Sequence, residues 1–210
     1  MNGARVPGSV LLTGFEPFGG QEMNASWAAV EAVADRWAEP PPLVVVRLPV
    51  SFRRARQALR AAVAEHAPQL VVCVGEAAER SAVGLERVAV NIIDAPQPDN
   101  DGSAPAGVPV IAGARAELPA ILPLADCLAA GIATGVPVEL SPSAGRYVCN
   151  ATFYALMHLV ERSDVRGGFV HVPRTHGQVP PGQPAMATSD AARALSAIVR
   201  AALVAVAGRE

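Results

Sequence analysis

The sequence predicts an α/β protein, a single-domain α/β/α sandwich with a mixed, mostly parallel central sheet. Short and almost wholly apolar runs, typical of strands buried on both faces, alternate with segments whose apolar residues recur every three or four positions. Apolar residues make up 51% of the chain and charged residues 17%, which indicates a compact and well-buried fold. The alternation is continuous along all 210 residues, so we expect one domain spanning residues 1–210.

The first third of the chain predicts three strands with a helix after each of the first two. A glycine-rich turn at 14–20 follows the first strand, a run of prolines at 40–42 ends the first helix, and Gly75 ends the third strand. The apolar runs that predict strands cover 10–13, 43–46 and 70–74, and the apolar stripes that predict helices cover 27–37 and 52–63.

The middle of the chain predicts a change of strand direction and a long loop. Only a short polar loop separates the third strand from an apolar run at 88–92, too short for a parallel crossover. We therefore expect these two strands to be antiparallel or offset, which makes the sheet mixed. Residues 94–113 are rich in Pro, Gly and Ala and predict a long ordered loop, a kind of segment that is often functional.

The remaining chain completes the alternation. Apolar residues at helical spacing predict three more helices, and two apolar runs predict two more strands. The helical stripes cover 118–128, 153–160 and 195–206, and the strands cover 136–140 and 168–172.

Composition and charge exclude several functional classes. The net charge of −2 gives no reason to expect nucleic acid or an anionic membrane as a partner. No stretch reaches the roughly 18 uninterrupted apolar residues of a membrane span, and the N-terminus lacks a basic region followed by an apolar segment of secretory length. The 3 cysteines are an odd number, which argues against a disulfide framework. We expect a cytoplasmic protein.

The first strand-to-helix turn, 13–20, carries two phenylalanines, Phe15 and Phe18. Glycine-rich turns of this kind often cradle phosphate, so a nucleotide-binding α/β protein is one hypothesis. The glycine spacing matches neither the dinucleotide fingerprint nor the P-loop, and the chain contains no Lys, which counts against it. The two rings either face a ligand or pack into the core.

The three cysteines differ in their surroundings. Cys73 lies in an apolar strand and Cys127 in a helix beside apolar neighbours, as expected of small buried hydrophobes. Cys149 directly precedes the helix that begins near Asn150. A helix N-terminus lowers the pKa of a thiol and offers N–H groups that can bind an oxyanion. Cys149 is therefore a candidate nucleophile, with a structural role as the alternative.

Two further residues are candidates for acid–base chemistry. His171 lies at the carboxyl end of a buried strand, the edge at which open α/β sheets bind ligands. It is either a general base or a satisfied core histidine. Glu86 opens the predicted strand at 87–92 and either orients a histidine or forms a surface ion pair. No two His or Cys residues have the spacing of metal ligands, so we expect neither a metal nor another cofactor.

Several segments in order resemble one known family. They are Thr-Gly-Phe-Glu-Pro-Phe-Gly-Gly at 13–20, Glu-Arg-Val-Ala-Val-Asn at 86–91, Val-Cys-Asn at 148–150 and Gly-Phe-Val-His-Val-Pro at 168–173. Asp94, Pro-Asp-Asn at 98–100 and Phe-Tyr-Ala-Leu-Met at 153–157 fit the same pattern. Together they resemble the pyroglutamyl peptidase I family of cysteine exopeptidases, also called pyrrolidone-carboxylate peptidases, from about residue 10 to about residue 203.

The resemblance implies a function and a site. Cys149 is then the nucleophile, His171 the base and acid, and Glu86 the carboxylate that orients His171. The substrate is a peptide with an N-terminal pyroglutamyl residue, cleaved through a thioester intermediate. The resemblance also implies that Phe15 and Phe18 enclose the lactam ring, with Asn24 and Val148 nearby, and that the protein is a homo-oligomer, a tetramer.

The chain departs from the family pattern near the expected pocket. Glu76 stands in Gly-Glu-Ala-Ala-Glu-Arg at 75–80, where the family has a neutral Gln, and we count it among the substrate-binding residues. Pro96 replaces an arginine and Gln97 an apolar residue that we expect to line the pocket. The alternative to an active peptidase is a catalytically weakened protein that binds pyroglutamyl or similar cyclic N-termini.

Overall fold

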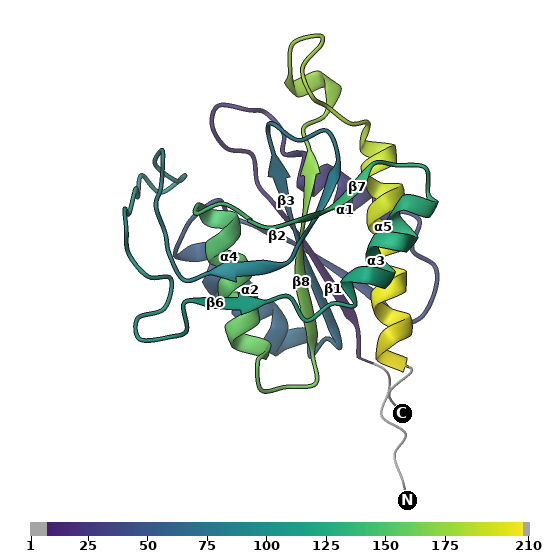
Figure 1. Ribbon diagram of the computed structural model, residues 1–210, viewed down its shortest axis with the longest axis horizontal. Helices are drawn as coiled ribbons and strands as arrows, with labels where there is room; N and C mark the ends of the chain where they lie inside the picture. Colours follow the sequence, from purple (N-terminus) through teal and green to yellow (C-terminus); the bar gives the residue numbers. More distant parts are fainter. Residues whose placement is uncertain (1–7, 208–210) are drawn as a thin grey trace, which may run out of the picture.

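The computed structural model describes residues 8–207 and is built around a six-stranded sheet with the order β2-β1-β3-β8-β4-β7 (Figure 1). Every neighbouring pair is parallel except β4 and β8, which are antiparallel. The predicted mixed, mostly parallel sheet is therefore confirmed. Its strands are β1 (Val10–Phe15), β2 (Leu43–Leu48), β3 (Leu70–Ala77), β4 (Val83–Glu86), β7 (Val138–Ser141) and β8 (Arg166–Pro173).

Helices cover both faces of the sheet, and the predicted α/β/α sandwich is confirmed. On one face α1 (Ala25–Ala34) and α3 (Leu124–Ala133) pack against α5 (Thr188–Ala207), and on the other α2 (Arg54–His66) packs against α4 (Val148–Val160) (Figure 1). Successive side chains of a strand point to opposite faces of the sheet. Val10 and Leu12 of β1 accordingly join the core beneath α1 and α5, whereas Leu11 and Phe15 join the core beneath α2 and α4.

The strand predicted at 88–92 is not part of this sheet. Its residues form β5 (Val88–Val90), which pairs with β6 (Glu117–Pro119) in a separate two-stranded sheet. The strand that enters the main sheet against β8 is β4, which has no clear pattern in the sequence because it is only four residues long and carries Gly84. Glu86 therefore ends a strand rather than opening one.

The helix predicted over 118–128 begins later than its apolar stripe suggests. Leu118 lies in β6, and α3 starts after Pro123. A proline restricts the residue before it to extended conformations, and the ring fits the start of a helix better than its interior. Pro119 and Pro123 thus divide the stripe into a strand and a helix. Among the described residues, no helix combines the length and the apolar character needed to cross a membrane.

Candidate active site

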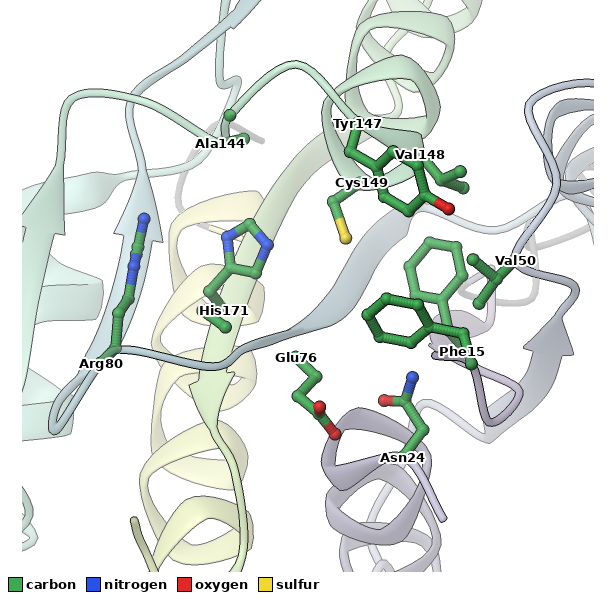
Figure 2. A pocket seen from close by; sticks show the side chains of 13 residues that line it. Phe15, Asn24, Val50, Glu76, Arg80, Ala144, Tyr147, Val148, Cys149 and His171 are labelled. Carbon is green, nitrogen blue, oxygen red and sulfur yellow. The ribbon is translucent and has the colours of Figure 1, made fainter. Parts of the chain in front are cut away.

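A cavity of about 240 Å³ opens where β1, β3 and β8 end, at the ligand-binding edge expected of an open α/β sheet. All of the predicted site residues except Glu86 line it (Figure 2), and Glu86 contacts the Nδ1 atom of His171. The lining residues are Phe15, Phe18, Asn24, Val50, Glu76, Ala77, Arg80, Ala144, Gly145, Tyr147, Val148, Cys149 and His171.

His171 and Glu86 are in direct contact. The Nδ1 atom of His171 lies 2.8 Å from Oε1 of Glu86, and the Glu86 side chain is completely buried. In the strand register His171 of β8 pairs with Gly75 of β3 and with Gly84 of β4. A carboxylate on one ring nitrogen favours the tautomer in which Nδ1 carries the proton, which leaves Nε2 free to accept one.

Cys149 reaches the same cavity from the opposite side. It is the second residue of α4, and its sulfur and the ring of His171 point into one space (Figure 2). Gly75 makes this approach possible, because a Cβ atom at that position would lie 2.9 Å from the Cys149 Sγ and 2.8 Å from Cζ of Phe169. The structure therefore brings all three predicted catalytic residues together.

The electrostatics of the two acidic groups differ. Burial acts to raise the pKa of Glu86, but the hydrogen bond from His171 and the charges of His171 and Arg80 outweigh it, so the pKa is lowered. Burial raises the pKa of Cys149 to about 12, with smaller contributions from the charges of Glu86 and Glu76. Glu86 is therefore ionised at neutral pH, and the Cys149 thiol is protonated.

The raised pKa of Cys149 corrects the expectation that its helix position lowers it. Withdrawal from water and the charges of Glu86 and Glu76 raise the pKa, and they outweigh the charge of Arg80, which acts to lower it. Burial also raises the pKa of Cys73 to about 12 and that of Cys127 to about 11. Acidity therefore does not set Cys149 apart from the other two thiols. Access to the cavity does, because Cys149 is only partly buried while Cys73 and Cys127 are fully buried.

The other end of the cavity is aromatic and apolar. Phe15, Phe18 and Val148, three of the predicted substrate-binding residues, line it; Phe15 is buried and Phe18 is half-buried, with its ring centroid 6.2 Å from that of Tyr147. Tyr147 and Val50 also line this end, and neither is among the residues predicted from the sequence. Tyr147 directly precedes Val148 and so had a detectable signal in the sequence, whereas Val50 is brought in only by the fold.

Asn24 is part of the cavity wall, but its polar atoms are already bonded. Its Oδ1 caps α1 by accepting hydrogen bonds from the backbone N and the hydroxyl of Ser26, at 3.0 and 2.7 Å. Its Nδ2 donates to the carbonyl oxygen of Glu16 at 3.0 Å. Asn24 therefore shapes the wall and fixes the start of the helix behind it.

Glu76 is likewise committed to protein partners. Its Oε1 accepts from Nε of Arg174 at 2.9 Å, and its Oε2 accepts from the backbone N of Ala25 at 2.7 Å and from Nε2 of Gln178 at 2.8 Å. The Arg174 guanidinium offsets the negative charge that Glu76 brings near the pocket. The side chain of Glu76 is only 2% exposed and connects β3, the start of α1 and the segment after β8.

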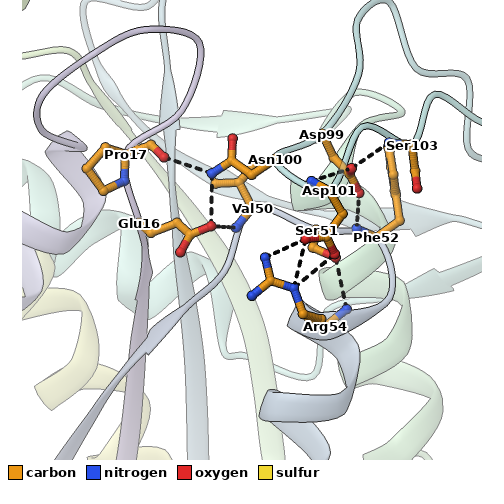
Figure 3. A network of polar contacts seen from close by, with 10 residues as sticks. All are labelled: Glu16, Pro17, Val50, Ser51, Phe52, Arg54, Asp99, Asn100, Asp101 and Ser103. Carbon is orange, nitrogen blue, oxygen red and sulfur yellow. Dashed lines mark hydrogen bonds and ion pairs between the residues drawn. The ribbon is translucent and has the colours of Figure 1, made fainter.

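The long loop at 94–113 holds the aromatic end in place through a network of polar contacts (Figure 3). Asp99 is buried and accepts hydrogen bonds from the backbone N atoms of Phe52 and Ser103 at 2.9 and 2.8 Å. Asn100 donates to Oε1 of Glu16 at 2.8 Å, and the same oxygen accepts from the backbone N of Val50 at 3.0 Å. The loop thus joins the turn that carries Phe18 to the segment that carries Val50.

The two departures within this loop lie away from the cavity. Pro96 and Gln97 are exposed, and neither is among the residues that line it. The expectation that Gln97 lines the pocket is therefore wrong. Asp99 and Asn100 fold the loop over the turn at 14–20, and this leaves Pro96 and Gln97 on its outer side. Within residues 8–207, no group of three or more His, Cys, Asp or Glu side chains could hold a metal ion.

Known proteins match this chain over most of its length. The family model described as "Pyroglutamyl peptidase" matches residues 8–206. The pyrrolidone-carboxylate peptidase of Clavibacter michiganensis subsp. michiganensis is 45% identical over 197 residues, covering 93% of this chain and 92% of that protein. The corresponding enzyme of Streptomyces coelicolor is 43% identical over 199 residues, covering 92% of this chain and 91% of that protein. The crystal structure of pyroglutamyl peptidase I from Bacillus amyloliquefaciens superposes with a TM-score of 0.90 at 35% identity, over 94% of this chain and 96% of that one.

Proposed function

Because this chain belongs to the pyroglutamyl peptidase family of cysteine peptidases, we propose that it removes N-terminal pyroglutamyl residues from peptides and proteins through Cys149, His171 and Glu86. The observation that carries the assignment of residues is the 2.8 Å contact between Nδ1 of His171 and Oε1 of Glu86, beside a cavity that the Cys149 sulfur also lines. A nucleophile, a base and a group that orients the base are the parts that covalent hydrolysis requires.

The reaction begins with a proton transfer. Nε2 of His171 accepts the proton of the Cys149 thiol while the sulfur attacks the carbonyl carbon of the pyroglutamyl residue. Since burial raises the pKa of Cys149 to about 12, the thiolate forms during the attack rather than before it. Glu86, ionised and held against Nδ1, stabilises the imidazolium that results.

The tetrahedral intermediate then collapses. The backbone N–H of Cys149, at the free N-terminal end of α4, is the proposed donor to the oxyanion. The imidazolium protonates the departing amine, the C–N bond breaks, and a thioester remains on Cys149. Water deprotonated by His171 attacks the thioester, and the thiol takes back its proton as free pyroglutamate leaves.

The aromatic end of the cavity suits the ring of the substrate. A lactam is flat and neutral, so a slot formed by Phe15, Phe18 and Tyr147 can hold it with few polar contacts. An open N-terminal Gln carries a protonated amine, and burying that charge without a partner costs several kcal/mol. Both oxygens of Glu76 already accept from Arg174 and two further donors, so Glu76 can stabilise that amine only weakly.

Release of a chromophore from a pyroglutamyl amide tests the proposal, with matched glutaminyl and prolyl amides on the same preparation. We expect release from the pyroglutamyl amide, a preference for the ring of about 10²-fold or more, and no release by Cys149→Ser. Binding of a pyroglutamyl peptide without turnover would instead favour the weakened binder. Equal cleavage of the glutaminyl amide would make the protein a general aminopeptidase.

Three further expectations accompany this proposal. Residues 1–210 are proposed to act as one pyroglutamyl-peptidase-like domain, of which 1–7 and 208–210 lie outside the described residues. The cytoplasmic location and the homotetramer stay predictions. Light scattering on the purified protein measures its mass in solution and tests the tetramer.

A further inference from the structure

We propose that Arg80 is a positioning residue for the Glu86–His171 pair, and that Gly84 lacks a side chain in order to make room for the Arg80 guanidinium. This inference rests on the proposed function, because it concerns how the base of that reaction is held. Arg80 lies between β3 and β4, and the ring of His171 lies between Arg80 and Cys149 in Figure 2.

Arg80 contacts the same carboxylate oxygen as His171. Its Nη1 lies 2.8 Å from Oε1 of Glu86, the oxygen that also lies 2.8 Å from Nδ1 of His171. The second oxygen, Oε2, is buried without a hydrogen-bond partner among the described residues. Nη1 of Arg80 is likewise without a hydrogen bond among the described residues, so its contact with Oε1 is an ion pair that acts through charge. Because the ion pair and the His171 contact fall on one oxygen, the arginine favours the orientation in which the carboxylate meets the imidazole.

The other side of the guanidinium is fixed by the segment that leads to the nucleophile. Nη2 of Arg80 donates to Oγ of Ser141 at 2.9 Å and to the carbonyl oxygen of Ser143 at 3.1 Å. Ser141 ends β7, and Cys149 follows it at the start of α4. Arg80 therefore joins the carboxylate that orients the base to the chain segment that presents the sulfur.

Gly84 is what allows the guanidinium to occupy this position. A Cβ atom at residue 84 would lie 2.1 Å from Nη1 of Arg80, whereas the next residue it would meet, Ser141, is an ordinary contact at 3.6 Å. The backbone of β4 passes so close because Gly84 pairs with His171 across the antiparallel ladder. The clash is with the tip of a flexible side chain, so Gly84→Ala is expected to fold and to displace the guanidinium.

Three substitutions at this contact separate the charge of the guanidinium from its position. Arg80→Met removes the guanidinium, and Gly84→Ala keeps it but moves it away from Glu86. Arg80→Lys keeps a cation that can reach the carboxylate but loses the forked contact with Ser141 and Ser143. If the position of the guanidinium matters, the first two variants share one kinetic signature and the third retains part of the activity.

We expect kcat on a pyroglutamyl amide to fall about 10- to 100-fold in Arg80→Met and in Gly84→Ala, the range typical when a group that orients a reacting side chain is lost. KM should change by less than about threefold, because the lost contact supports the transition state and not ring binding. Arg80→Lys should lie between these variants and the unmodified protein. Arg193→Met, which removes a surface ion pair with Asp190, and Gly177→Ala, where a Cβ meets nothing within 4 Å, are the matched controls and should leave both constants unchanged.

Some results would overturn the proposal. Unchanged kcat in Gly84→Ala, whatever Arg80→Met does, would mean that the position of the guanidinium is irrelevant. A rise in KM with kcat unchanged would make Arg80 a substrate contact instead. If Arg80→Met does not fold, Gly84→Ala and Arg80→Lys still carry the test.

A second readout separates this inference from the proposed function. If the unmodified protein does not turn over the pyroglutamyl amide, the proposed function fails, but the rate at which iodoacetamide alkylates Cys149 still reports on the base beside it. We expect slower alkylation in both Arg80→Met and Gly84→Ala than in the unmodified protein and the two controls. Equal rates in all five proteins would overturn the role of Arg80 independently of turnover.

Discussion

Two buried carboxylates, Glu86 and Glu76, lie beside the same cavity and have different roles. The side chain of Glu86 is 0% exposed and that of Glu76 is 2% exposed. Each is paired with one arginine, Arg80 for the first and Arg174 for the second. A buried carboxylate without such partners would carry a large desolvation penalty, so both pairs are needed simply to bury the charge.

The carboxylate oxygens of Glu76 and Glu86 differ in the partners that they have besides an arginine. Both oxygens of Glu76 are engaged, and besides Arg174 its donors are a helix backbone N and the amide of Gln178, none of which exchanges protons near neutral pH. Glu86 instead faces an imidazole, which does exchange protons, and one of its oxygens has no partner among residues 8–207. Glu76 and Glu86 are alike in burial and charge, so it is the hydrogen-bond partners that distinguish them. The partners of Glu76 suit a carboxylate that holds segments together, and the imidazole beside Glu86 suits one that supports the proposed chemistry.

The largest loss of activity is expected when His171, the partner of Glu86, is removed. His171→Ala deletes the imidazole that the proposed mechanism uses to move protons between the sulfur, the leaving amine and water. We expect kcat/KM on a pyroglutamyl amide to fall by roughly 10⁶-fold, as when a nucleophile or its base is removed from a hydrolase. Cys149→Ala should cost as much, and the double variant no more, because the two residues act as one unit. If kcat/KM of the double variant is much lower than that of either single variant, the two residues do not act as one unit.

Glu86→Gln tests the carboxylate while keeping its shape. The amide retains a contact with His171 and loses the charge that stabilises the imidazolium, so we expect a large loss in kcat, at most about 10⁴-fold. Steady-state kinetics of Glu86→Gln and His171→Ala on one substrate compare the two directly. A larger loss from Glu86→Gln than from His171→Ala would reverse the assignment of roles.

The same substitution at Glu76 should change KM rather than kcat. Glu76→Gln leaves one oxygen where two now serve three donors, so the wall around Asn24 and the segment carrying Gln178 loosen. We expect KM to rise by about 3- to 10-fold with kcat nearly unchanged, since contacts to the ring are alike in the ground and transition states. The melting temperature should also fall. A large drop in kcat at constant KM would show that Glu76, like Glu86, takes part in the chemistry, and the distinction between the two carboxylates would be wrong.

The smallest expected effect is on the alkylation of Cys149, whose pKa is raised in part by the charges of both carboxylates. Because the pKa of Cys149 is raised to about 12, its thiolate fraction should climb tenfold per pH unit, and alkylation by iodoacetamide should rise from pH 6 to pH 9 without a plateau. Glu76 contributes to that raised pKa, so Glu76→Gln should lower it and speed alkylation a few-fold. Peptide mapping by mass spectrometry separates Cys149 from the buried Cys73 and Cys127. A plateau below pH 8 would reveal a preformed thiolate.

Position along the chain indicated candidates for the proposed chemistry, and the resemblance to a known family gave them their roles. His171 was singled out at the end of a buried strand and Cys149 at the start of a helix, and both lie at the cavity. Glu86 was also found, but in the wrong element, because four residues of strand around a glycine leave almost no periodic signal. Arg80 had no signal of its own, since a single arginine in a polar loop looks like any solvated charge.

Sequence by itself determined the features that depend on local order and composition: the alternation of strands and helices, the aromatic turn with Phe15 and Phe18, and the candidate thiol and imidazole. Only the tertiary structure decided what depends on approach between distant segments. Glu76 and Arg174 are 98 positions apart, and their ion pair turns a charge near the pocket into a structural contact. The raised pKa of Cys149 likewise depends on burial and on carboxylates from β3 and β4. Desolvation and Coulomb interactions act through space, and a linear pattern holds no record of those distances.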